Sequence, residues 1–571
     1  MLAQFFRNRF DSSQKLSSFT IYIVLLVLVG LQGCSQQSDR IANPQEPKPD
    51  LSQFVRWCLG EQGDLAPEAR HTVNMILERS GVRRSGAIGT GAKECDLAPK
   101  QLSNLKELNL SSAKIADLRP LQSLTHLAKL DLSFNQISDL SSLSTLTELT
   151  RLNLSANQIR DISSLSTLTE LTRLNLSANQ IRDISFLSSL TNLVHLDLSS
   201  NQISDIGALS SLTQLANLNL AKNQKIADIA ALSSLANLIR LDLRFNQISD
   251  LSALSSSTQL TELFLSNNQI ADIDALSSLT QLETLDLNQN QISDINGLSS
   301  LTNLVQLQLW QNQISNINAL SSLTDLADLV LSNNQIADIG ALANLEKLTY
   351  LNLGFNQITD LRPLANLANL TNLSVPYNKV VKLDPLAGLT QLSHLSLSHN
   401  QIADITPLKS LTNLTDLALD YNSIINLQSL EGLAGLAKLN LGNNQIADIA
   451  RLQSLKNLES VALNNNQIAD ISPLSYLSLL RQVQLFNNRI SDLSPLSSCQ
   501  NLVSLGLGNN RISDVAALAG LQNLSKLSLI DNLVADASPL ASLSQLNTLD
   551  LRHNPISNKT CPVQPASICG F

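Results

Sequence analysis

Hydrophobic and polar positions repeat along most of this chain with a period of 22 residues. Asparagine recurs at this interval from Asn135 to Asn554, with one slip of a single residue between Asn223 and Asn246. Each asparagine stands in the frame L-x-x-L-x-L-x-x-N-x-I-x-D-[IL]-x-x-L, as in residues 149–165. A fixed period of this length indicates a solenoid, in which each repeat forms one coil and neighbouring coils share a core.

The alternation before each asparagine predicts a short β-strand. Leu152 and Leu154 alternate with polar residues, so the leucines should point into the core. Their neighbours, such as Arg151 and Asn153, should point outward. Successive strands would then stack in parallel, about 4.8 Å apart. We expect the asparagine amide to be buried after the strand and to hydrogen-bond the backbone of its own and adjacent coils.

The frame resembles the leucine-rich repeat in its 22-residue, internalin-like class. The match covers residues 101–558 and gives 21 coils when Ala113 is counted as a degenerate first position. The resemblance implies an α/β solenoid, a right-handed superhelix with a concave parallel β-sheet and short 3₁₀ or helical segments on the convex side. Residues 141–163 and 163–185 are identical, which indicates a recent tandem copy.

Two departures from the frame should disturb the coils locally. Lys225 is an extra residue between Gln224 and Ile226, so we expect a bulged turn there. Pro376 occupies the last outward strand position of its coil. Proline has no N–H, so we expect this residue to remove a donor from the strand ladder and to kink the sheet.

The first 33 residues have the pattern of a secretory signal peptide. Basic residues precede an apolar run of 13 residues, which is shorter than the roughly 20 residues that span a membrane. The sequence Leu31-Gln32-Gly33-Cys34 resembles a bacterial lipobox, which implies cleavage before Cys34 and lipid attachment to that cysteine. Ser35 resembles the signal for outer-membrane sorting, so we expect export and a lipid anchor at the outer membrane or cell surface. The alternative is an uncleaved anchor.

Two caps and a tether are expected around the repeats. Residues 34–50 are polar and rich in proline, which predicts a semi-extended tether. Residues 51–100 lack the frame and contain a predicted helix at 66–78, so they indicate an N-terminal capping module. Residues 559–571 would form the C-terminal cap. For an exported protein, we expect the structural disulfides Cys58–Cys95 and Cys561–Cys569.

The negative net charge of the chain limits which classes of molecule it is expected to bind. The formal net charge is −9, and it becomes −11 without residues 1–33, which carry +2. An acidic body argues against nucleic acid as the main partner. Much of this charge comes from an aspartate that follows the asparagine in most coils, such as Asp117 and Asp139. Capping of the following turn and calcium binding are the two interpretations of this row.

The sequence shows no catalytic constellation, metal-ligand motif or cofactor motif, and we expect a protein that is not an enzyme. Its six histidines have no paired-ligand spacing. Asp416 and Asp420 should lie near His394 and His399 on an outward face. Such exposed groups have little desolvation to shift their pKa values, so acid–base catalysis is not indicated.

Aromatic residues are scarce, yet within the repeats they concentrate at outward strand positions and just before the asparagine. Because the core does not need them there, we predict a binding surface for a protein ligand, with glycan as the alternative. Residues just before the asparagine have a second interpretation, in which they only cover the strand edge. The candidate partner-binding residues are Arg240, Arg244, Phe245, Phe264, Trp310, Tyr350, Phe355, Tyr377, His394, His399 and Tyr421.

Overall fold

The computed structural model describes residues 50–60, 66–82, 92–557 and 559–571. Cys34 and the proposed signal peptide lie outside the described residues, as does the tether except for Asp50. The described residues all belong to one compact unit. No helix in these ranges is long and apolar enough to cross a membrane.

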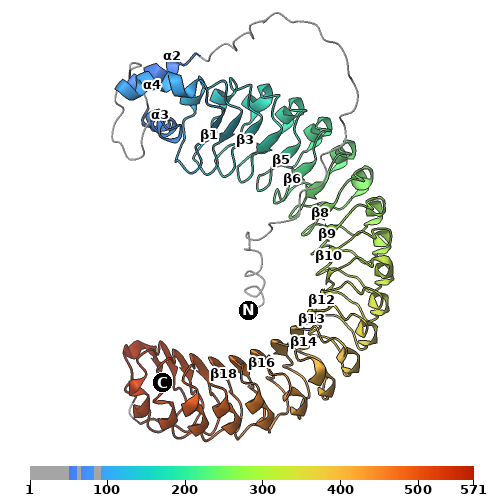
Figure 1. Cartoon of the computed structure of the whole chain (residues 1–571), viewed down its shortest axis with the longest axis vertical. Coiled ribbons are helices and arrows are strands. Elements are labelled where there is room, and N and C mark those ends of the chain that lie inside the picture. Colours follow the sequence, from blue (N-terminus) through green and yellow to red (C-terminus); the bar gives the residue numbers. More distant parts are fainter. Residues whose placement is uncertain (1–49, 61–65, 83–91, 558) are drawn as a thin grey trace, which may run out of the picture. The chain divides into compact units, whose positions relative to one another are not determined.

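Each coil contributes one three-residue strand to a single parallel sheet, and a two-residue strand from the C-terminal cap completes it. Register shifts by one repeat per strand, so Leu307 pairs with Leu285 on one side and Leu329 on the other. The strands lie along the inner side of the curved stack of coils (Figure 1). They are β1 Glu107–Asn109, β2 Lys129–Asp131, β3 Arg151–Asn153, β4 Arg173–Asn175, β5 His195–Asp197, β6 Asn217–Asn219, β7 Arg240–Asp242, β8 Glu262–Phe264, β9 Thr284–Asp286, β10 Gln306–Gln308, β11 Asp328–Val330, β12 Tyr350–Asn352, β13 Asn372–Ser374, β14 His394–Ser396, β15 Asp416–Ala418, β16 Lys438–Asn440, β17 Ser460–Ala462, β18 Gln482–Gln484, β19 Ser504–Gly506, β20 Lys526–Ser528, β21 Thr548–Asp550 and β22 Cys569–Gly570.

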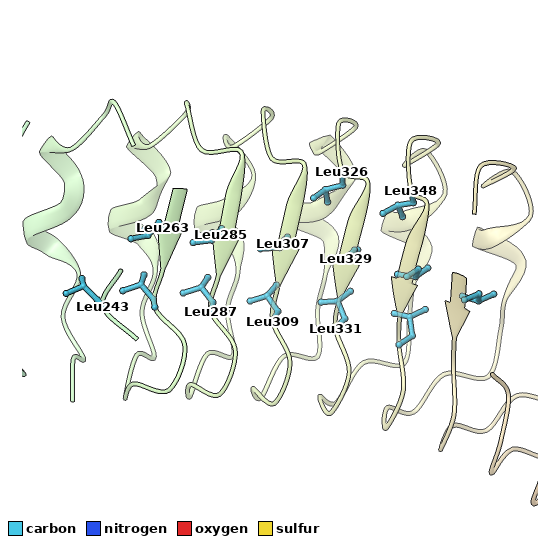
Figure 2. Close-up of a cluster of buried hydrophobic side chains, with 14 of the residues drawn as sticks. Leu243, Leu263, Leu285, Leu287, Leu307, Leu309, Leu326, Leu329, Leu331 and Leu348 are labelled. Carbon is cyan, nitrogen blue, oxygen red and sulfur yellow. The ribbon is translucent and has the colours of Figure 1, made fainter. Parts of the chain in front are cut away.

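The core is made of columns of leucine and isoleucine that run from coil to coil. Leu307 and Leu309 of one coil are fully buried between their counterparts in the adjacent coils (Figure 2). Complete burial of such a side chain contributes roughly 1.5–3 kcal/mol. A coil cannot bury its own leucines alone, so each depends on its neighbours.

The repeated asparagine ties successive coils together, as the sequence predicts. In one example, Asn157 Nδ2 donates to Leu154 O in its own coil (3.0 Å) and to Leu132 O in the preceding coil (3.0 Å). Its Oδ1 accepts the N–H of Ile137 at 3.0 Å. The side chain is 9% exposed, so these bonds form away from water. One amide therefore satisfies backbone groups of two coils.

Asn246 is an exception that the sequence explains. Its Nδ2 donates to Leu220 O and Leu243 O, both at 3.0 Å. Its Oδ1 is buried without a hydrogen-bond partner in the described structure. The N–H that would fill this place belongs to Ile226, which follows the inserted Lys225 directly. The expected bulge therefore costs the coil one inter-coil hydrogen bond.

The convex side carries one short 3₁₀ segment per coil, from η1 (Arg119–Leu121) to η20 (Ser538–Ser542). The aspartate of the frame caps it, since Asp161 Oδ1 accepts the N–H of Ser163 at 2.8 Å. The equivalent hydrogen bond from the backbone N–H of Ser185 is the largest cause that lowers the pKa of Asp183. Asn316 makes the same bond to the N–H of Asn318 at 2.9 Å, so the turn needs an oxygen acceptor and not a charge. In the described ranges, no three or more histidine, cysteine, aspartate or glutamate side chains come together in a group that could hold a metal ion.

The expected disruption at Pro376 is wrong. The ladder continues through this coil, with Val375 N donating to Ser396 O at 2.8 Å and Tyr377 N to Ser398 O at 2.9 Å. In the preceding coil, the equivalent N–H of Gly354 donates to Asn352 Oδ1 and not to the next strand. The position of Pro376 therefore supplies no ladder donor, and proline is tolerated there.

Three helices cover the first coil: α2 (Ser52–Leu59), the predicted α3 (Pro67–Arg79) and α4 (Ala92–Leu102). A disulfide joins Cys58 of α2 to Cys95 of α4, as expected. On α3, Thr72 Oγ1 donates to Asp117 O at 2.7 Å and fixes the helix against the first coil. The module therefore shields the open end of the core.

The C-terminal cap adds a strand of its own. The disulfide Cys561–Cys569, which the sequence also suggested, closes a short loop. Its second cysteine begins β22, which pairs with β21 through Leu549↔Cys569 and Asp550↔Gly570. The C-terminal cap thus covers the last coil partly through the backbone pairing of β22 with β21.

We expect Asn268→Ala to lower the free energy of unfolding by roughly 2–4 kcal/mol, because it leaves several buried backbone groups unpaired. Asn246→Ala is the matched control, and it should cost about 1 kcal/mol less because its Oδ1 already lacks a partner. Denaturant unfolding followed by circular dichroism measures both. Equal losses would contradict the role assigned to the inter-coil bond.

Candidate functional site

The outward side chains of the sheet are set by the strand alternation. In β8, Leu263 is buried, whereas Glu262 and Phe264 on either side of it are half-buried. The next outward position is Ser266, and Asn267 then leaves the strand with a positive φ of 59°. Each coil thus offers three sheet-face positions and one edge position, and the candidate residues occupy both kinds.

Arg240, Arg244 and Phe264 form one cluster on the sheet face. The guanidinium carbons of the two arginines lie 4.6 and 5.1 Å from the centre of the Phe264 ring. Arg240 forms an ion pair with Glu262. Arg244 Nε donates to Asp242 Oδ1 at 2.9 Å, and this bond is the largest cause that raises the pKa of Arg244. The charges are therefore balanced within the cluster, which presents aromatic and guanidinium surface.

Trp310 and Tyr350 remain on the outward side of the sheet and are half-buried, unlike the leucines of the core. Trp310 follows β10, and its backbone N–H donates to Asn288 Oδ1 at 2.6 Å. Tyr350 begins β12, two coils further along. The sheet thus fixes the backbone at or near each of these residues, as it does for Phe264.

Phe355, Tyr377, His399 and Tyr421 form a stacked ladder at the edge of the sheet. Successive ring centres lie 4.1, 3.9 and 3.9 Å apart, with interplanar angles of 12–15°. Tyr377 and Tyr421 are 41% and 48% exposed. Burial lowers the pKa of His399, against the opposing effect of Asp420, which favours the neutral form of the ring. The ring faces cover one another and the ring edges face outward.

The ladder occupies backbone positions that favour other residues. Tyr377 has a φ of 54°, in the left-handed region where bulky side chains are strained. Later coils place asparagine at the same position, as at Asn443 and Asn465. Each stacked aromatic pair contributes about 0.5–1.5 kcal/mol, which offsets this strain. The stacking explains part of the aromatic enrichment at the edge without any ligand.

Two further candidates lie apart from these groups. Phe245 is at the edge, with Lys222 Nζ 5.9 Å from its ring centre. His394 Nε2 lies 3.4 Å from Asp416 Oδ2, and Lys438 pairs with the same carboxylate at 3.0 Å. The eleven residues therefore comprise a sheet-face cluster, two further sheet-face aromatics, an edge ladder, the separate edge residue Phe245, and His394 in an ion-pair row.

Ser393, His394 and Asp416 combine the residue types of a hydrolase triad. Ser393 Oγ lies 2.8 Å from His394 Nδ1, but it also donates to Thr371 O at 3.1 Å. Thr371 Oγ1 makes the same bond one coil earlier, to Thr349 O at 3.0 Å. The hydroxyl thus belongs to a repeated structural row. The arrangement gives no support for a nucleophile.

A further surface was missed in the sequence analysis. The outward residues of β1–β7 line a groove of about 810 Å³, and in most of these coils the residue six positions before the asparagine is basic. The sequence could have indicated this surface, because the basic residues recur at the same outward position of the 22-residue repeat. The basic members of this row are Lys129, Arg151, Arg173, His195 and Arg240.

Comparison with known families agrees with this architecture. The family described as Leucine Rich repeats (2 copies) matches thirteen segments that run from 103–145 to 478–520. These segments cover most of the chain. The chain belongs to the leucine-rich-repeat family. No curated protein matches the sequence.

Solved leucine-rich-repeat structures from several organisms are similar to this one. An internalin of Listeria monocytogenes is 34% identical with a TM-score of 0.50, over 59% of this chain and 92% of the internalin. A leucine-rich-repeat protein of Leptospira interrogans is 25% identical with a TM-score of 0.50, over 72% of this chain and 92% of its own. A plant peptide hormone receptor, solved in complex with RGF2, is 21% identical with a TM-score of 0.62, over 79% and 86% of the two chains. The last similarity shows the fold alone.

For this leucine-rich-repeat protein, we expect Tyr377→Ala to lower the free energy of unfolding by about 1–3 kcal/mol, because two stacked pairs are lost. Tyr377→Asn should cost less, because asparagine adopts a positive φ more readily than alanine. Thermal or denaturant unfolding measures both variants. Equal losses would contradict the balance between stacking and backbone strain.

Proposed function

We propose that this protein is a non-enzymatic recognition protein that binds a protein ligand on the concave face of its sheet. Leucine-rich repeats are typical protein-binding scaffolds, and the plant receptor among the structural neighbours was solved with RGF2 bound. The strands and the asparagine bonds hold the face in place before any ligand arrives. Binding therefore needs little rearrangement, which reduces its entropic cost.

The observation that carries this proposal is the placement of Phe264, Trp310 and Tyr350. These residues are only half-buried, on strands whose core is already complete with leucine. The leucine core does not require aromatic rings at these positions, whereas aromatic and arginine side chains are the usual energetic anchors of protein interfaces. The charge-balanced Arg240–Phe264–Arg244 cluster adds arginine surface to the same face.

The size of this surface also fits a protein partner. Seven coil spacings separate β8 from β15, which corresponds to roughly 34 Å of sheet. This length is sufficient for an interface of ordinary size. A glycan is less well supported by the edge ladder, because the stacked rings cover the faces on which sugars would pack.

The proposal includes the location of the protein. Export and lipid attachment at Cys34 would hold the repeats at a bacterial outer membrane or cell surface. The two disulfides support an oxidising compartment, where such bonds persist. Mass spectrometry of the mature protein tests this part: an acylated N-terminal Cys34 is expected, and a chain that retains residues 1–33 would refute it.

We expect the double substitution Trp310→Ala/Tyr350→Ala to weaken binding of the ligand by at least about tenfold, since anchors of this kind dominate interfaces. Affinity capture from surface-protein extracts with the acyl-free protein, followed by titration of the captured protein, measures the effect. Thermal stability should change little, because neither ring belongs to the leucine core.

Phe486→Ala is the matched control, because Phe486 also lies half-buried at an outward position but outside the central stretch. It should leave the affinity unchanged. If the double variant binds as tightly as the original protein, the sheet-face proposal fails. Binding to target cells that survives protease treatment would favour a glycan ligand instead.

A further inference from the structure

The groove over β1–β7 contains basic side chains that differ in whether they have an acidic partner. Lys129 forms an ion pair with Glu107, and Arg240 forms one with Glu262. Arg151 and Arg173, which lie between them, form no ion pair with any other described residue. The two unpaired arginines therefore mark the middle of the groove.

The next outward position of each strand, two residues after the basic one, also lacks carboxylates at the centre of the groove. Along β2 to β5 it reads Asp131, Asn153, Asn175 and Asp197, so carboxylates flank the site and amides occupy its centre. Amides there leave the charges of the two arginines uncompensated. This local positive charge stands on a chain whose net charge is −9.

Register places the two arginines side by side. Arg151 pairs with Arg173 and Arg173 with His195 in adjacent strands, so their Cα atoms are about 4.8 Å apart. Two guanidinium groups on adjacent strands repel each other, and an anion bound between them would offset this repulsion. Arg173 Nη2 lies 3.4 Å from His195 Nε2. Burial and the nearby arginines lower the pKa of His195, which favours the neutral form of this ring beside the two arginines.

The two asparagines add hydrogen-bond donors to the same place. Asn153 Oδ1 accepts the N–H of Ser155 at 3.2 Å, and Asn175 Oδ1 accepts the N–H of Ser177 at 2.9 Å. With the oxygens occupied, each amide has its Nδ2 group left as a donor. The tandem copy thus provides the same pair of donor side chains, one guanidinium and one amide, in two adjacent coils.

We propose that Arg151, Arg173, Asn153 and Asn175 form a carboxylate-binding site for an acidic, extended peptide segment of a protein partner. Arginine binds carboxylate through two parallel N–H···O bonds, and the amides donate to the remaining oxygen lone pairs. In an extended peptide, carboxylates two residues apart lie about 6.8 Å from each other, within reach of both guanidinium groups.

The chemistry of the groove favours a peptide over a glycan, because no phenylalanine, tyrosine or tryptophan lines it for a sugar ring to pack on. The proposal rests on the proposed function, in that the ligand is a protein, but it assigns a different part of the sheet to it. The site lies at β3 and β4, several coils before Trp310 and Tyr350.

The test uses a fluorescent peptide of about eight residues that alternates glutamate and serine, long enough to span the groove when extended. The matching peptide with glutamine in place of glutamate is the ligand control. Fluorescence anisotropy with the acyl-free protein measures the affinity. We expect saturable binding of the acidic peptide that weakens as salt is added, and no binding of the glutamine peptide.

Arg151→Gln/Arg173→Gln should weaken binding of the acidic peptide at least about tenfold. Arg160→Gln/Arg182→Gln is the matched control, because these substitutions remove the same charge from two arginines of the same two coils. These arginines pair with Gln180 and Gln202 away from the sheet face. This control should change the affinity less than about twofold. Thermal unfolding verifies that both variants remain folded.

Several outcomes would overturn the proposal. It fails if the acidic peptide does not bind at about 1 mM, or if both arginine variants bind it equally. Tighter binding of a sulfated oligosaccharide, lost in Arg151→Gln/Arg173→Gln, would assign the site to a glycan. Trp310→Ala/Tyr350→Ala should bind the peptide normally, so failure of this site and failure of the central aromatic surface can be distinguished.

Discussion

The hydrogen bonds of one buried asparagine per coil are the constraint on which this structure depends. Each amide donates to a carbonyl of its own coil and to one of the preceding coil, and in every described coil except that of Asn246 its oxygen also accepts an N–H from the preceding coil. These bonds fix the register of neighbouring strands without using any outward side chain. The leucine columns then bury the rest of the coil.

This division leaves the sheet face open to variation. Because the asparagine, leucine and aspartate positions carry the fold, the positions between them can change from coil to coil at little cost to stability. The chain uses them for three different surfaces: a groove with unpaired arginines, a charge-balanced cluster around Phe264 and a stacked edge ladder ending at Tyr421. A single long sheet can thus carry more than one contact region.

Much of the fold could be predicted from the sequence, because the period and the alternation determine strands, turns and core. The helix at α3, both disulfides and the capping role of the aspartates are confirmed. The effect of Pro376 was predicted wrongly, because the sequence does not show that this N–H is absent from the ladder in every coil. Helices α2 and α4 were missed, because α2 begins without a side-chain cap and α4 contains Pro99, which usually argues against a helix.

The candidate surface was predicted less completely, because its properties arise between coils. The frame indicates which residues point outward, but not that Arg240 pairs with Glu262 or that Tyr377 stacks between Phe355 and His399. These contacts join residues 22 positions apart and depend on side-chain conformation. The binding roles of the outward aromatics and of Cys34 remain predictions.

Hydrogen exchange of Asn268→Ala tests most directly whether the asparagines link the coils. The N–H of Ile248 donates to Asn268 Oδ1 at 3.0 Å from the preceding coil, twenty residues earlier in the chain. The account predicts that this amide loses protection in the variant together with the coils on either side of Asn268. Loss of protection confined to residues next to Asn268 in sequence, with Ile248 unchanged, would contradict it.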